Sequence, residues 1–497
     1  MTELYGQYVE YLQKIADVNY SSAILQWDQE VNMPPKGAHF RSRQLATLAG
    51  YAHELITDKK YGKLLEELRS KTDGLGPKEC ANVLESYRIY SQQKKYTTAF
   101  VTELNLCISA AFNAWQEAKK KNDYALFRPH LQKLIDLKRK EADVLGYEAH
   151  PYDAHLNLYE TGLKTAFVDK LFDGVRKKLV PYIKQLISKQ QPEDGFLFLQ
   201  YDKDKQWNFG LYVLRQLNYD FDAGRQDIST HPFTTNFSAD DVRITTRISE
   251  HELFEMIGSC IHECGHALYE QGLPSDDYGL PSGEYLSLSI HESQSRLWEN
   301  HVGKSRAFWK LNFPHLQQQF SEQLGNISAE QFYKAINRIK PSLIRTNADE
   351  LTYHLHVLIR FEIEKEILAG KLDAATLPEV WNAKYKEYLG IDVPSADKGV
   401  LQDVHWSHGS FGYFPTYSMG SFYASQFFHA ARKENPELMH QIENGNMKPL
   451  LQWLRQNIHQ YGRTMLSDEL CKNITGEVLN FDYFFNYIKT KYDELYA

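Results

Sequence analysis

Residues 252–271 read ELFEMIGSCIHECGHALYEQ, a segment with strong helical periodicity. Within it, His262, Glu263 and His266 form the pattern H-E-x-x-H. Because residues four apart lie on one face of a helix, both imidazoles can bind one metal ion, and Glu263 can face a water on that ion. The remaining periodic positions predict an apolar stripe along the same helix: Leu253, Met256, Ile257, Cys260, Ile261, Cys264, Ala267 and Leu268.

A catalytic zinc site needs a third protein ligand and one open position. A loop and a second predicted helix, from about residue 284, follow the first helix and carry HESQ at 291–294. Glu292 lies 26 positions after His266 (292 − 266), which fits a return helix packed beside the first. Two histidines and a glutamate are the ligands of thermolysin-type zinc peptidases. We therefore expect Glu292 to be the third ligand, with His291 as the competitor, since adjacent helical residues point about 100° apart and both should not bind.

Two other interpretations apply to this helix. The two histidines could simply pair with surface carboxylates. Cys260 and Cys264 also stand four apart and could form a thiolate site, but they fall on the apolar stripe, which favours buried packing.

Most of the remaining chain also shows helical periodicity. The exception is 206–248, where Val242–Ile248 alternates apolar and polar residues and is predicted to be a strand. The sequence therefore predicts a mostly α fold with one small sheet near its middle. The predicted helices cover 2–17, 40–55, 60–71, 80–120, 129–145, 164–190, 329–340, 350–369, 376–389, 420–433 and 448–461.

Composition excludes several classes of protein. The 497 residues are 42% hydrophobic and 24% charged, which is ordinary for a globular protein. A net charge of −8 disfavours non-specific nucleic-acid binding, and no apolar run is long enough to predict a membrane span. The N-terminus does not read as a secretory signal, and five cysteines do not suggest a disulfide framework, so we expect a cytoplasmic protein.

Several further motifs accompany the metal helix, and together they resemble the thermostable (Taq-type) carboxypeptidase family of metallocarboxypeptidases. The resemblance spans nearly the whole chain and includes an N-terminal Trp27-Asp28 and a late GYFPTY at 412–417. The other motifs are HPF at 231–233, DVRIT at 241–245, HESQ at 291–294, IRTNAD at 344–349 and GVLQDVHW at 399–406.

The resemblance implies a helical, saddle-like fold with a deep cleft, similar to neurolysin and angiotensin-converting enzyme, with one small antiparallel sheet. It implies one catalytic domain over 1–497, with the N-terminal helices forming a cleft wall or lid and the metal site within 231–417. It also implies a homodimer, a zinc ion in each chain that cobalt or manganese can replace, and peptide substrates with a free C-terminus that lose single residues with broad specificity.

These expectations assign roles to individual residues. His262, His266 and Glu292 hold the metal, and Glu263 acts as general base toward the attacking water. Glu299, Asp349 and Asp403 are candidates for orienting the imidazoles from an outer shell.

The oxyanion of the reaction needs a further donor, for which Tyr413, Tyr417, His405 and His231 are candidates and core packing is the alternative for each. Similar folds use a tyrosine and a histidine, which favours Tyr413 with one of the histidines.

A free α-carboxylate suits the planar fork of an arginine. Arg345 is the first candidate, Arg243 the second, and Tyr417 is a further substrate-binding candidate. The alternative for Arg345 is an ion pair with Asp349 at i+4. Strand 241–248 is expected to offer an edge to the extended substrate.

The competing functions are an oligoendopeptidase or dipeptidyl carboxypeptidase on the same scaffold, a non-catalytic metal- or peptide-binding protein, and a helical interaction scaffold. A base beside an open coordination position argues against the non-catalytic binding protein, and an interaction scaffold predicts no metal in the purified protein.

Overall fold

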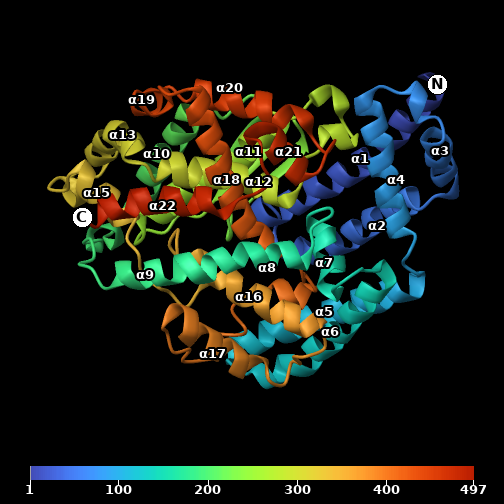
Figure 1. Cartoon of the computed structure of the whole chain (residues 1–497), viewed down its shortest axis with the longest axis horizontal. Helices are drawn as coiled ribbons and strands as arrows, with labels where there is room; N and C mark the ends of the chain where they lie inside the picture. The colour runs from blue at the N-terminus through green and yellow to red at the C-terminus, as the bar shows by residue number, and fades with distance from the viewer. Residues whose placement is uncertain (1) are drawn as a thin grey trace. The chain divides into compact units, whose positions relative to one another are not determined.

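The computed structural model describes residues 2–497 and confirms the mostly helical fold (Figure 1). The chain forms two compact units, each built from three separate segments of sequence. Unit 1 comprises Met1–Gln93, Glu193–Ile336 and Tyr423–Val478, and unit 2 comprises Lys94–Pro192, Asn337–Phe422 and Leu479–Ala497. None of the helices described here combines the length and the apolar character that a bilayer crossing needs.

Unit 1 holds the predicted metal helix. Its N-terminal helices pack through Tyr8, Leu12 and Ile15 against Leu65 and Leu280. The helices of unit 1 are α1 (Thr2–Val31), α2 (Ala38–Ile56), α3 (Lys59–Arg69), α4 (Pro77–Gln93), α10 (Lys203–Gln216), α11 (Leu253–Glu270), α12 (Leu288–Arg296), α13 (Arg306–Gln319), α14 (Ser321–Leu324), α15 (Ala329–Ile336), α19 (Leu438–Glu443), α20 (Lys448–Asn457) and α21 (Ser467–Thr475).

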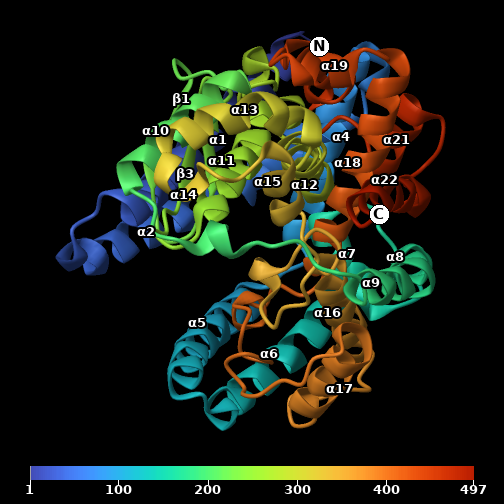
Figure 2. The same cartoon turned by 90° about the vertical axis from the view of Figure 1, so that its left-hand side faces the viewer.

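Unit 2 contains the helical pair α5 and α6, which run side by side in Figures 1 and 2. The long helix α18 (Phe414–Glu434) begins in unit 2 and ends in unit 1. Apart from α18, the helices of unit 2 are α5 (Thr98–Lys121), α6 (Tyr124–Leu145), α7 (Pro151–Tyr159), α8 (Thr165–Gly174), α9 (Val180–Ile187), α16 (Tyr353–Leu368), α17 (Leu377–Leu389) and α22 (Phe481–Leu495).

The predicted range 80–120 is not one helix. Helix α4 ends at Gln93 and α5 begins at Thr98, because the side chain of Thr97 accepts a hydrogen bond from the amide of Phe100 and caps the new helix. In contrast, 164–190 is almost continuous. A π-helical turn, η3 (Val175–Leu179), joins α8 to α9 there.

The small sheet lies where the sequence predicts it, but it is mixed and not antiparallel. Its strands are β1 (Gly224–Ile228), β2 (Thr234–Ser238) and β3 (Asp241–Thr246), in the order β1-β3-β2. Strand β3 pairs antiparallel with β2 and parallel with β1, with Val242 opposite Gly224 and Ile244 opposite Thr234. The expectation that β3 offers a free edge is therefore wrong, because both of its sides are paired, and the outer strands are β1 and β2.

The apolar stripe of α11 is confirmed, since every residue predicted for it is at most 1% exposed. The helix packs on β2 and β3 on one side and on α12 on another. Burial of that stripe fixes the rotation of α11 about its axis. It therefore determines the direction in which the H-E-x-x-H residues point.

A buried carboxylate organises the 405–412 segment of unit 2. Glu364 accepts hydrogen bonds from Trp406 Nε1 at 2.8 Å, from the Gly412 amide at 2.9 Å and from the Tyr152 hydroxyl at 2.7 Å. Burial raises the pKa of Glu364 to about 7, while the three donors oppose the shift. These bonds hold the Trp406 indole, next to His405, and the Gly412 backbone, next to Tyr413.

Candidate metal centre

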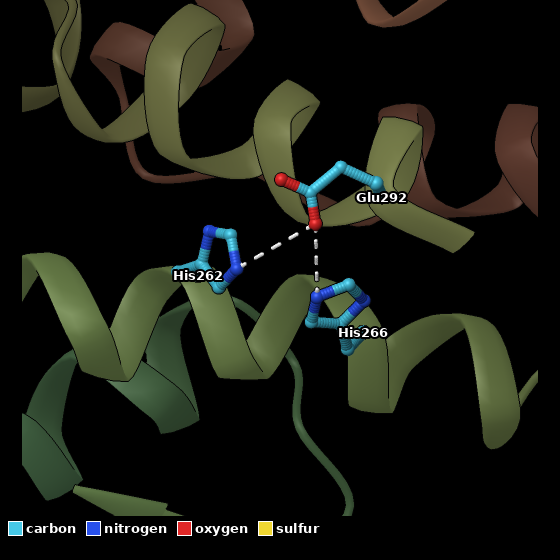
Figure 3. Close-up of side chains that lie close together, drawn as sticks. All are labelled: His262, His266 and Glu292. Atoms are coloured by element: carbon cyan, nitrogen blue, oxygen red, sulfur yellow. Dashed lines mark ion pairs between the residues drawn. The ribbon is translucent and has the colours of Figure 1, made fainter. Parts of the chain in front are cut away.

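Three potential metal ligands converge in unit 1 from two neighbouring helices (Figure 3). Oε2 of Glu292 on α12 lies 3.5 Å from His266 Nε2 and 3.9 Å from His262 Nε2 on α11. The three ligand atoms all lie within 4.8 Å of one another. Among the described residues, this is the only group of three or more such side chains that could hold a metal ion.

The donor set fits a zinc ion. Tetrahedral ligands about 2.1 Å from zinc stand about 3.4 Å apart, close to the separations of Glu292 from the imidazoles. Three protein ligands leave the fourth position for water, which is the arrangement of catalytic rather than structural zinc sites.

The environments of His266 and Glu292 favour a metal ion over protons at these two ligands. Burial, with His291 nearby, lowers the pKa of His266 to about 3, so its imidazole is neutral and its lone pair is available. Burial disfavours an ionised Glu292, but Arg296 and the two imidazoles outweigh it and hold the pKa of that carboxyl below its usual range. A neutral imidazole and an ionised carboxylate are the forms that bind zinc.

Glu299 orients His262. Its Oε2 lies 2.9 Å from His262 Nδ1, and it also accepts hydrogen bonds from Arg296 and Lys304. Glu299 lies in η7 (Leu297–Gly303), a π-helical turn that continues α12. From one continuous helical segment, Glu292 thus faces His262 Nε2 while Glu299 contacts His262 Nδ1.

Glu263, the predicted base, is a buried carboxylate next to His262 on α11. It is only 7% exposed, and its Oε2 accepts a 2.6 Å hydrogen bond from Thr234 Oγ on β2. Burial raises the pKa of Glu263, while His262 and Thr234 oppose that shift. A raised pKa brings a carboxylate closer to the range in which a base works best near neutral pH.

A glycine allows α11 and α12 to approach each other. A Cβ atom at Gly265 would lie 2.5 Å from Ser295 Cα and 2.8 Å from the Gln294 carbonyl oxygen, both backbone atoms that cannot rotate away. Only glycine at this point of the H-E-x-x-H motif permits the spacing that brings Glu292 to the two imidazoles.

The structure gathers four other predicted residues in unit 2. His405 Nε2 lies 3.3 Å from the Tyr417 hydroxyl, and the Tyr413 ring packs 5.1 Å from that of Tyr417. The Arg345 guanidinium lies 5.0 Å from the Tyr417 ring centre. Burial, helped by Arg345, lowers the pKa of His405 to about 3, so this imidazole is neutral and keeps one N–H donor.

Arg345 pairs with Asp403 and not with Asp349, the local partner considered from the sequence. Its Nε and Nη2 donate to Asp403 Oδ1 at 3.1 and 2.9 Å, and its Nη1 donates to the Tyr353 hydroxyl at 3.0 Å. Arg360 Nε donates to the second Asp403 oxygen at 2.6 Å. Asp349 instead accepts the amides of 340, 351 and 352, as a helix-capping carboxylate does.

The remaining two candidates, Arg243 and His231, make their contacts with residues other than the three predicted metal ligands. Arg243 makes two 2.8 Å bonds to Asp241, and its guanidinium lies 4.4 Å from the ring centre of Trp27. His231 is exposed, and its carbonyl accepts from Ser229. Both side chains belong to the turn and sheet that support α11.

Sequence reasoning considered His291 only as a competing ligand and missed Glu270, yet both residues lie behind His266. His291 Nδ1 lies 2.5 Å from His266 Nδ1, the ring nitrogen other than the one that faces Glu292, and His291 Nε2 lies 2.7 Å from Glu270 Oε1. Glu270 stands four residues after His266 on α11, so helical spacing alone could have singled it out.

The comparisons with known proteins identify the family of the chain. The family model of the carboxypeptidase Taq (M32) metallopeptidases matches residues 7–492. The chain belongs to this family. Carboxypeptidase 1 of Bacillus subtilis is 37% identical over 491 residues, covering 99% of this chain and 98% of that protein. Thermostable carboxypeptidase 1 of Thermus thermophilus is 37% identical and covered to 99% on both sides.

A solved M32 carboxypeptidase from Deinococcus radiodurans superimposes with a TM-score of 0.97 at 39% identity, over 99% of each chain. Membership of the M32 family confirms the resemblance found in the motifs. The chain is accordingly a metal-dependent carboxypeptidase, and a divalent ion belongs to its chemistry.

We predict that Gly265→Ala weakens metal binding by at least about tenfold. The added methyl group forces α11 and α12 apart and draws Glu292 from the imidazoles, and such overpacking costs about 1–3 kcal/mol of stability. Isothermal titration of the metal-free protein with zinc measures the first effect, and thermal unfolding measures the second.

Gly258→Ala is the matched control on the same helix. Its Cβ would meet only the Phe254 ring, with the nearest atom, Cε1, at an ordinary 3.4 Å, so this variant should keep zinc affinity and unfold at the same or a higher temperature. Equal zinc affinity in the two variants would contradict the proposed role of the helix spacing.

Proposed function

We propose that this M32 carboxypeptidase removes single residues from the free C-termini of peptides, using one zinc ion per chain held by His262, His266 and Glu292. The observation that supports this proposal is the convergence of one carboxylate and two imidazoles from α11 and α12. Cobalt or manganese is proposed to replace zinc, since all three accept nitrogen and oxygen ligands.

A bound zinc ion supplies a Lewis acid that polarises the scissile carbonyl and lowers the pKa of water. Glu263 is proposed to take the proton of the attacking water and to pass it to the leaving amine. Thr234 holds one oxygen of this carboxylate, which fixes the direction of the side chain. Glu299 keeps His262 in one orientation during turnover.

The cluster in unit 2 is proposed to serve the substrate. Tyr413 and His405 are the proposed donors to the developing oxyanion, with Tyr417 beside them and His231 as the alternative histidine. Arg345 is proposed to bind the α-carboxylate, since its guanidinium stays charged and lies among the rings of this cluster. Arg243 is the second candidate for that role.

We also propose that the two units act as one catalytic domain, in which the N-terminal helices form a wall or lid of the substrate cleft. A homodimer and a cytoplasmic location are proposed as well. The absence of disulfides among the five cysteines, all present as free thiols, is compatible with a reducing compartment.

Mass spectrometry of one digested peptide tests the activity. The zinc enzyme should produce a ladder of single-residue losses from the C-terminus, whereas Glu263→Gln should bind zinc normally and lose about 10²- to 10⁴-fold in kcat. Internal cuts or dipeptide losses would instead indicate an oligoendopeptidase or a dipeptidyl carboxypeptidase. A fully active Gln variant would remove Glu263 from the mechanism.

A pair of arginine variants tests the docking of the carboxylate. For Arg345→Met we expect the ratio of kcat/KM on a free-acid peptide to that on its C-terminal amide to fall by roughly 100-fold, as expected for losing hydrogen bonds to a charge. Asp403 keeps its bond to Arg360 in this variant, which limits the damage to the fold. If Arg243→Met lowers the ratio and Arg345→Met does not, the assignment of the two arginines is reversed.

A further inference from the structure

We propose that His291 and Glu270 form a relay that positions the metal ligand His266, with His291 acting as an imidazole spacer between the ligand and a buried carboxylate. The proposal rests on the proposed function, because it takes His266 as a ligand. It assigns His291 a role other than the direct ligation considered from the sequence. All the residues involved lie in unit 1.

The distances define a chain of hydrogen bonds that leads away from the metal site. Nε2 of His266 faces Glu292 at 3.5 Å, and its Nδ1 lies 2.5 Å from His291 Nδ1. Nε2 of His291 in turn lies 2.7 Å from Glu270 Oε1. Both nitrogens of each ring are thus engaged, one toward the metal side and one toward the carboxylate.

Metal binding fixes the direction of these bonds. When His266 Nε2 gives its lone pair to a cation, the ring proton must reside on Nδ1, which then donates to His291 Nδ1. His291 must therefore carry its own proton on Nε2 and donate it to Glu270. Each acceptor in the chain then meets one donor, and the position of each ring proton is set by the next group.

Glu270 is suited to end the chain. Its side chain is only 4% exposed, and its second oxygen accepts a 2.8 Å hydrogen bond from Asn236 Nδ2 on β2. The same strand holds Glu263 through Thr234, so β2 fixes both the proposed base and the end of the relay. A buried, oriented carboxylate raises the basicity of the imidazole that donates to it.

Aromatic rings keep His291 in position. The rings of Tyr269 and Tyr285 pack against its imidazole with centres 5.5 and 5.0 Å away. Tyr285 is covered in turn by the guanidinium of Arg463, which donates to the Tyr285 carbonyl. The ring of His291 therefore has little freedom to turn away from His266.

The two proposed histidine ligands are consequently oriented by carboxylates in different ways. His262 contacts a carboxylate directly, that of Glu299, whose charge is shared with Arg296 and Lys304. His266 reaches its carboxylate only through a second imidazole. Removal of the spacer should therefore affect the metal site without touching the support of His262.

Zinc and cobalt binding to the metal-free full chain tests the relay in four variants. His291→Phe keeps a ring between the tyrosines but has no nitrogen, so we expect zinc to bind about 10–100-fold more weakly and the visible absorption bands of the cobalt enzyme to shift. Glu270→Gln can still accept from His291 but lacks the charge, so we expect a smaller change in the same direction.

Two further variants distinguish a failure of the relay from a failure of the proposed metal site. His315→Phe replaces an exposed histidine whose ring lies tilted against that of Tyr212, and it should match the unmodified protein in zinc affinity and cobalt spectrum. His266→Ala should abolish tight binding. If His266→Ala retains tight zinc binding, the proposed metal site fails. If His266→Ala loses zinc while His291→Phe and Glu270→Gln retain the affinity and spectrum of the unmodified protein, the relay alone is overturned.

Discussion

The metal centre depends on the close packing of α11 against α12. Two imidazoles on one helix can bind a cation only weakly unless a third ligand arrives from elsewhere, and here Glu292 comes from the return helix. The buried stripe of α11 sets the rotation of the first helix, and Gly265 sets its distance from the second. Function thus depends on core packing as directly as on the ligands themselves.

Around this contact, burial and neighbouring charges shift the pKa values of His266, Glu292 and Glu263. Burial keeps His266 neutral, Arg296 helps to keep Glu292 ionised, and burial raises the pKa of Glu263. Strand β2 holds the Glu263 carboxylate through Thr234 and the Glu270 carboxylate through Asn236. The small sheet therefore works as a support for α11, in which β3 is the paired central strand and β2 provides the contacts.

Local patterns in the sequence predicted the elements better than their pairing. The apolar spacing of 252–271 gave a correct helix, and the alternation after Val242 gave a correct strand. Alternation carries no information about the direction of a neighbouring strand, so the mixed sheet was missed. The cap at Thr97 that divides 80–120 was visible in principle, but the apolar periodicity on both sides concealed it.

In the candidate site, too, spacing along the chain was predictable and most contacts between elements were not. The two histidines follow from helical spacing, and Glu292 was found from the distance along the chain that a return helix needs. Glu299 was one of three outer-shell candidates, and only the three-dimensional packing, including the π-helical turn η7, separates it from Asp349 and Asp403. The contact between His291 and His266 depends on the register of α12 against α11, which no local pattern contains.

X-ray absorption spectroscopy of the zinc-loaded enzyme tests the proposed metal centre most directly. The account predicts a first shell of nitrogen and oxygen atoms at about 2.0–2.2 Å, with two imidazoles, and no sulfur. A sulfur shell near about 2.3 Å would instead place zinc on thiolates such as Cys260 and Cys264. That result would contradict the packing of these cysteines in the buried stripe and the ligand set proposed here.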